Sequence, residues 1–134
     1  NEIFILKDDE DLSIKIYPPE VIFAEKLETI IRFKTGNTRL KDFIDLWQLS
    51  KFTYNKNNLL DAVVKCFNNR KTKFDINELE NILSDKTFIE LLEKQKFKKY
   101  NNLNLPKIAE ILDDIINMVQ NNFNNRFEKS QPSL

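Results

Sequence analysis

Lysine and aspartate side chains occur at spacings that could handle phosphate on two consecutive predicted helices. Lys26 lies in a segment of helical periodicity, 18–34, and Asp42 and Asp45 lie in a second one that follows residue 38. A short connection makes two such helices antiparallel neighbours. Lys26 and Asp45 lie at similar distances along the chain from this connection. The difference is about three residues, which corresponds to roughly 4.5 Å along the helix axes. A lysine side chain spans that distance, so we expect Lys26 to approach Asp45.

This cluster has two interpretations. Asp42 and Asp45 share a helix face, so they repel each other unless a cation compensates. Lys26, Lys41, Arg39 or a divalent metal could supply the positive charge. The charges then form either an ion-pair network that fixes the two helices, or a face that handles phosphate or metal. Spacing alone favours the ion-pair network.

The composition excludes several kinds of active site. The 134 residues include no His, one Cys and one Gly. Without His, neither His-based acid–base catalysis nor a His-activated nucleophile can form within the chain. The single Cys66 permits no internal disulfide and no zinc cluster, and its apolar surroundings predict a core residue. The single Gly36 excludes a P-loop and a Rossmann fingerprint.

The charge balance excludes a global basic field but not a local one. Lys and Arg number 21, as do Asp and Glu. A local basic patch for nucleic acid remains possible. A basic and aromatic segment near residue 97 could bind RNA phosphates and stack on a base, or it could be a helix C-terminus that favours cations. Its members are Lys94, Lys96, Phe97, Lys98, Lys99 and Tyr100.

Two acidic groups outside the motif region are weaker candidates. The turn 8–11 offers carboxylates to Mg²⁺ or Ca²⁺, but it lacks the spacing and the Gly of a calcium loop. Glu110, Asp113 and Asp114 share one face of a predicted helix. We expect both groups to be solvated. Arg70 ends a helix and could act there as a cation or reach a phosphate, and the sequence leaves both open.

The predicted fold is mainly α-helical with a short N-terminal β-hairpin, an α+β arrangement. Period-two and β-branched runs predict the hairpin over 1–17, helical periodicity predicts about six helices over 18–127, and 128–134 forms a tail. Gly36-Asn37 is expected to end the first helix and Thr38 to cap the second. Later helices are expected to begin at a capping box from Asp75 to Glu78, at Ser84-Asp85 and at Pro106, and Trp47 is expected in the core.

The sequence predicts no association with a membrane. No apolar run reaches the length of a membrane-spanning helix, and the N-terminal residues do not have the layout of a signal peptide. With a single Cys, these features favour a reducing, cytoplasmic setting. The first residue is Asn and opens an apolar, strand-like run, so we expect the chain to be a piece of a longer protein.

Two blocks of the sequence resemble a known family, the nucleotidyltransferases of the AbiEii/AbiGii toxins, which are the toxin halves of type IV toxin–antitoxin and abortive-infection systems. The family pattern is an Ala-Glu-Lys-Leu helix, a short loop, and Arg-x-Lys-Asp-x-x-Asp-Leu. The matching residues are Tyr17-Pro18-Pro19-Glu20, Ala24-Glu25-Lys26-Leu27 and Asn37-Thr38-Arg39-Leu40-Lys41-Asp42-Phe43-Ile44-Asp45-Leu46-Trp47, with a looser match at Phe67 to Arg70 and Thr72.

The resemblance implies the helical C-terminal part of a polymerase-β-like nucleotidyltransferase. Such enzymes use a Gly-Ser turn and an Asp-x-Asp pair to bind Mg²⁺ and a nucleoside triphosphate, and an acceptor then displaces pyrophosphate. The implied partners are NTP, an RNA acceptor such as tRNA, and a cognate antitoxin. Neither the Gly-Ser turn nor the metal-binding pair is present here, so the resemblance assigns no metal ligand. It implies that the hairpin is the last piece of the catalytic sheet and that this chain alone is inactive.

The resemblance also assigns roles to five residues. Lys26 matches the third family motif and could neutralise triphosphate charge. Asp42 and Asp45 match the fourth motif as catalytic residues, with Arg39 and Lys41 beside them as substrate-binding residues. Asp45 could orient Lys26 or accept the proton of the acceptor hydroxyl. The alternative is a non-catalytic helical module that binds protein or RNA.

Overall fold

The computed structural model describes residues 17–36 and 39–130, and the side chains of residues up to 123. Within these ranges the chain forms six α-helices, one short 3₁₀-helix and no strand. The mainly helical class is therefore confirmed. The hairpin predicted over 1–17 lies outside the described residues, apart from Tyr17, which is not in a strand. The helices are α1 Pro19–Phe33, α2 Leu40–Leu49, α3 Lys56–Asn69, α4 Ile76–Leu83, α5 Lys86–Lys99 and α6 Ile108–Ser130.

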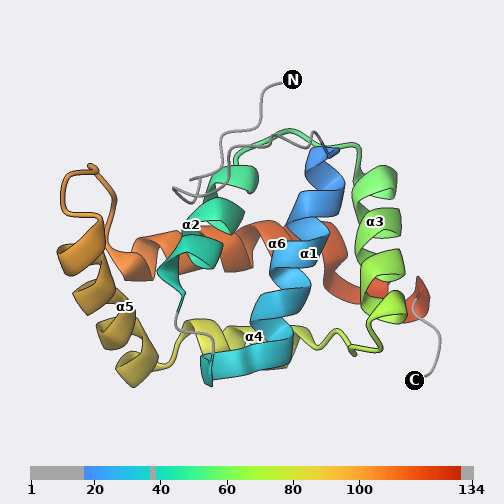
Figure 1. Ribbon diagram of the computed structural model, residues 1–134. Helices are drawn as coiled ribbons and strands as arrows, with labels where there is room; N and C mark the ends of the chain where they lie inside the picture. Colours follow the sequence, from blue (N-terminus) through green and yellow to red (C-terminus); the bar gives the residue numbers. More distant parts are fainter. Residues whose placement is uncertain (1–16, 37–38, 131–134) are drawn as a thin grey trace.

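Helix α1 lies at the centre of the fold. It begins with Pro19, whose fixed φ suits the first helical turn, and Glu20 lies where the helix dipole favours a negative charge. Its apolar stripe, which includes Phe23 and Leu27, is fully buried. In Figure 1, α1 lies between α2 and α3, with the long α6 crossing behind and α4 near its C-terminal end. Polar side chains on the faces of α1 that meet α2 and α3 therefore lie against another helix.

The end of α1 differs from the prediction. Lys34, rather than Gly36, adopts the left-handed conformation, with φ of 54°, and its N–H donates to the Ile30 carbonyl. One left-handed residue directly after the last helical turn is enough to end the helix. Gly36 instead lies in the 3₁₀-helix Lys34–Gly36 and does not have a positive φ.

The start of α2 is tied to a distant helix. Thr38, the predicted cap, lies outside the described residues, and Arg39 occupies the cap position with no capping bond from its side chain. The first free amide, Leu40 N–H, donates to Gln95 Oε1 of α5 at 3.2 Å. A side chain from another helix thus satisfies one of the amides that every helix start leaves open.

Three other helix starts follow the local sequence. The side chains of Asn55, Asp75 and Asp85 accept backbone N–H groups in the first turns of α3, α4 and α5. Such caps stabilise a helix by about 1 kcal/mol each. The helix starts predicted at Asp75 and at Ser84-Asp85 are confirmed.

The long α6 closes the core from behind. It begins at Ile108, just after the predicted Pro106, and its first amide donates to Glu93 Oε2 at 2.9 Å. Phe123 of α6 contacts the rings of Phe23 and Phe74 with centroid separations of 6.3 and 6.1 Å. The helix extends to Ser130, which is into the predicted tail 128–134. None of the helices in the described ranges combines the length and the apolar character needed to cross a bilayer.

Candidate functional site: a lysine–aspartate cluster between two helices

The structure brings four of the five predicted site residues together between α1 and α2. Lys26 Nζ lies 3.0 Å from Asp42 Oδ1 and 3.1 Å from Asp45 Oδ2. Lys41 Nζ lies 3.0 Å from the same Asp45 Oδ2. The predicted approach of Lys26 to Asp45 is therefore confirmed, and Asp45 Oδ2 accepts from two ammonium groups at once. We call these four residues the lysine–aspartate cluster.

The acids of this cluster are more deeply buried than the cations. The Asp45 side chain is fully buried and that of Asp42 is 8% exposed, whereas the Lys26 side chain keeps 23% of its surface and that of Lys41 keeps 14%. The carboxylates therefore form the floor of the cluster, and the ammonium groups lie nearer the solvent.

Lys26 stays charged in this environment. Burial acts to lower the pKa of its ammonium, but the charge of Asp45 and the hydrogen bond and charge of Asp42 act more strongly in sum, and the pKa lies above its ordinary value. The cluster thus holds a permanent cation at neutral pH. Lys26 therefore contributes a fixed positive charge between α1 and α2.

Arg39, the fifth predicted residue, lies at the surface just before α2. It is one residue from the amide that contacts Gln95 and two from Lys41. Arginine can contact a phosphate with two parallel N–H groups. Arg39 thus adds an exposed cation directly before the first turn of α2.

The cluster does not fit a divalent metal. Both aspartates already accept from lysine ammonium groups at about the distance of a strong ion pair. A metal would have to displace these cations and would also need further oxygen ligands. In residues 17–36 and 39–123, no three acidic or Cys side chains are grouped closely enough to hold a metal ion. The acidic turn 8–11 lies outside the described residues.

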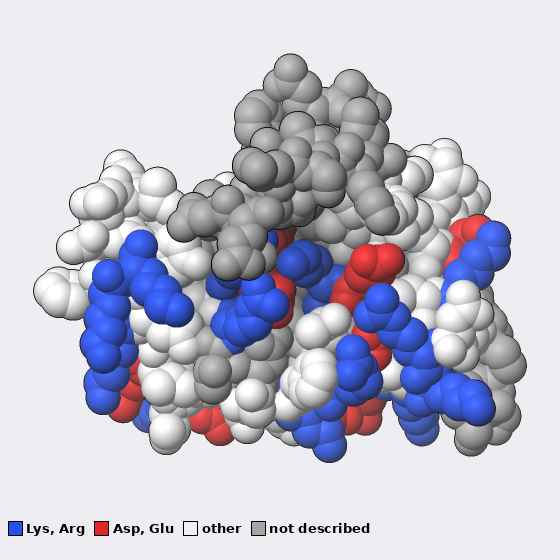
Figure 2. All heavy atoms as spheres, viewed as in Figure 1, with Lys and Arg blue, Asp and Glu red and all other residues white. Residues whose placement is uncertain are grey.

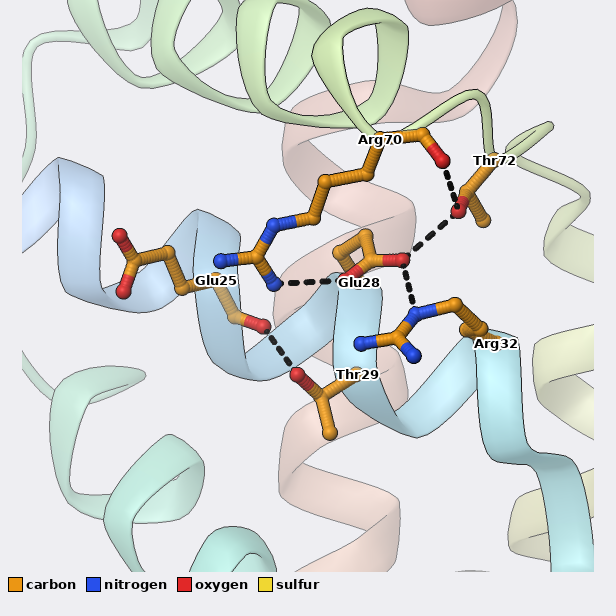
Figure 3. Close-up of polar contacts among 6 residues, drawn as sticks. All are labelled: Glu25, Glu28, Thr29, Arg32, Arg70 and Thr72. Carbon is orange, nitrogen blue, oxygen red and sulfur yellow. Dashed lines mark hydrogen bonds and ion pairs between the residues drawn. The ribbon is translucent and has the colours of Figure 1, made fainter.

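Sequence reasoning missed a second buried carboxylate on α1. Glu28 is fully buried and accepts from Arg32 Nε at 2.8 Å, Arg70 Nη1 at 2.8 Å and Thr72 Oγ1 at 2.7 Å. Figure 3 shows these groups converging on Glu28, with Arg70 reaching over from the end of α3. The contacts join α1 to the segment between α3 and α4. Arg70 follows the last residue of α3, and its guanidinium pairs with Glu28, which neither of the two predicted roles included.

The Glu28 network leaves that residue ionised. Burial acts to raise its pKa, but the hydrogen bonds from Arg32, Arg70 and Thr72 outweigh burial and lower the pKa below 4.5. One local signal could have revealed the network. Glu28 interrupts the apolar stripe of α1, and a charge in such a stripe needs a cation, which Arg32 supplies one turn later.

The remaining candidates take structural positions. Trp47, predicted to lie in the core, packs at its edge, and its indole N–H donates to Asp114 Oδ2 at 2.9 Å. Lys51 contacts the same oxygen at 2.8 Å. Glu110 and Asp113 are exposed on α6, as expected of a solvated face. Cys66 is half-buried against the core, and burial raises the pKa of its thiol.

Comparison with known protein families agrees with the helical fold and the two motifs. The family described as Nucleotidyl transferase AbiEii toxin, Type IV TA system, matches residues 2–129. The match covers nearly the whole sequence, including all five predicted site residues. The chain belongs to this family of nucleotidyltransferase toxins. Comparisons with curated proteins and with solved structures gave no match.

Proposed function

We propose that this chain is the part of a nucleotidyltransferase toxin that holds the triphosphate of an NTP during transfer of a nucleotide to an RNA acceptor. The family match supports the reaction class. The observation that carries the proposal is the arrangement of Lys26 and Lys41 on a buried acidic floor, because both residues lie in the family's motifs. A cognate antitoxin is the partner expected of a type IV system.

Each member of the cluster has a role under this proposal. Lys26 and Lys41 contact phosphate oxygens and neutralise charge that builds up as pyrophosphate leaves. Asp45, which is buried and contacts both ammonium groups, orients them, and Asp42 fixes Lys26 from the other side. Arg39 adds a phosphate contact at the rim. The burial of Asp45 favours this orienting role over proton transfer from the acceptor.

The magnesium-binding residues of the reaction do not come from the described part of the chain. The lysine–aspartate cluster is held by internal ion pairs, and the sequence contains no Gly-Ser turn ahead of an Asp-x-Asp pair. We therefore propose that the chain by itself transfers no nucleotide. Incubation with Mg²⁺, labelled NTPs and total RNA tests this, and labelled RNA would contradict it.

The site assignment is tested in a polypeptide in which the Gly-Ser and Asp-x-Asp segments precede this sequence. We expect Lys26→Ala to reduce transfer roughly 100-fold or more, since it removes a preorganised charge from the reacting phosphate. The matched control is Lys51→Ala, which removes another lysine that pairs with an aspartate of a neighbouring helix, at 2.8 Å. Circular dichroism checks that both variants stay folded.

The same assay separates this proposal from the alternative of a non-catalytic helical module. Full transfer by a folded Lys26→Ala variant would remove the site assignment. Absence of transfer by the unmutated longer polypeptide, with every NTP and with total RNA, would favour the non-catalytic module.

A further inference from the structure

Helix α5 presents an outward face that the fold does not use. Leu91, Lys94 and Lys98 follow one another at helical spacing, and Phe97 lies beside them. All four are exposed, and Phe97 keeps 75% of its surface. We call these four residues the α5 face.

The charges left on this side of the molecule are mostly positive. Glu93 and Lys96 point to the α6 side, where Glu93 accepts the Ile108 N–H and Lys96 Nζ contacts the Pro106 carbonyl at 3.2 Å. The outer charges of α5 are then the lysines at 86, 94, 98 and 99 against Glu90. Within the described part of the chain, Lys94, Lys98 and Lys99 form no ion pair. These ammonium groups are therefore available to an external anion.

Helix α5 contacts the start of α2, the helix that carries Lys41 of the lysine–aspartate cluster. Gln95 of α5 accepts the Leu40 N–H at the start of α2, one residue before Lys41. In Figure 1, α5 lies on the side of α2 that is away from α1. Figure 2 shows Lys and Arg side chains along α5 and over the start of α2 on the same face of the molecule. A strand bound along α5 would therefore meet further positive charge at the start of α2.

We propose that the α5 face binds an unpaired segment of RNA, with Phe97 stacked on a base and Lys94 and Lys98 on the flanking phosphates. One exposed aromatic ring among lysines matches single-stranded nucleic acid, whose bases stack and whose backbone is anionic. A protein partner is less favoured because lysine is depleted in protein interfaces and the apolar area here is small. The inference rests on the proposed function, since it places the acceptor on the helix that contacts the start of α2, one residue before Lys41.

The test measures binding of a fluorescein-labelled, unstructured 20-nucleotide RNA by anisotropy, without NTP or Mg²⁺. Phe97→Ala should lower the affinity roughly 5- to 100-fold, and Phe97→Trp should retain it, because stacking needs an aromatic ring. An abasic 20-mer should bind wild type and Phe97→Ala equally. A loss with Phe97→Ala on both probes would overturn the stacking role.

The lysines are tested by salt dependence. Lys94→Ala/Lys98→Ala should reduce the slope of log affinity against log salt by about 1.4, the value for two lost phosphate contacts to a single strand. The control Lys56→Ala/Lys65→Ala removes the same charge from exposed positions of α3. An equal loss in both variants would show a general charge effect and overturn the proposal.

Two further outcomes assign a failure to its cause. In the first, poly-glutamate competes with the RNA at the same concentration of negative charge. If it displaces the RNA, the surface suits an acidic protein, and the RNA proposal is wrong. If the protein binds RNA but transfers no nucleotide, the result counts against the proposed function alone. If it transfers nucleotide but does not bind RNA, the result counts against the α5 face alone.

Discussion

Asp45 is the residue whose role the geometry constrains most. It is fully buried, and one of its oxygens accepts from both Lys26 and Lys41. An acid that orients two ammonium groups acts on phosphate binding, whereas a general base acts on the chemical step.

The two roles of Asp45 predict different kinetics in the longer polypeptide described above. In the orienting role, Asp45→Asn should raise KM for NTP about tenfold or more and also lower kcat, because the lysines lose their fixed positions on both the bound triphosphate and the leaving pyrophosphate. Steady-state rates at varied NTP concentration measure both constants. A roughly 100-fold or larger fall in kcat at unchanged KM would instead identify Asp45 as the base.

A second prediction at the residue scale concerns Glu28. The direction in which its contribution to stability changes with pH follows from its lowered pKa. Because the folded protein holds the Glu28 pKa below 4.5, the stabilisation is present above that pH and is lost as the pH falls through the folded pKa. At pH 7, Glu28→Gln should therefore lower the free energy of unfolding by about 2 kcal/mol, the scale of hydrogen bonds to a charged group. Urea unfolding at pH 7 and at pH 3 measures the change.

The control for Glu28→Gln is Glu25→Gln, which alters an exposed carboxylate on the same helix. We expect that variant to unfold within about 0.5 kcal/mol of wild type at pH 7. For Glu28→Gln, the difference from wild type should shrink toward pH 3. A difference that stays constant with pH would mean that Glu28 acts through packing rather than through its charge.

At the scale of elements, α1 is the helix that positions the site. Lys26 and Glu28 are two residues apart, which places them about 200° apart around the helix axis. Lys26 fixes α1 to α2, and Glu28 fixes it to the segment after α3. The rotation of α1 is thus set from two opposite sides, which keeps the Lys26 ammonium in place.

Helix α5 begins at a cap formed by a side chain. Asp85 accepts the Phe88 N–H at 2.8 Å, and α5 packs less extensively against the rest of the fold than α1 does. We expect Asp85→Ala to lower the free energy of unfolding by about 1 kcal/mol. Thermal unfolding measures this, with Ser84→Ala as the control, because the Ser84 hydroxyl contacts only carbonyl groups in the preceding turn. Equal effects of the two substitutions would show that the cap is not what matters.

At the scale of the whole molecule, the features that could be predicted from the sequence are those that depend on residue spacing within one helix or between two adjacent helices. Helical periodicity and capping residues placed the helices, and the register of two adjacent helices predicted the contact between Lys26 and Asp45. The partners of Glu28 at Arg70 and Thr72, and the contact of Gln95 with the start of α2, could not be predicted. They join residues more than 40 positions apart, and their pairing depends on how the helices pack.

The hydrogen bond that the first amide of α2 donates to Gln95 bears on how this protein can be studied. A peptide that spans only the two signature motifs would lack the side chain that completes the second helix and the carboxyl-terminal helix that covers it from behind. Inhibitor screens and binding measurements aimed at the ammonium pair therefore require the entire helical assembly.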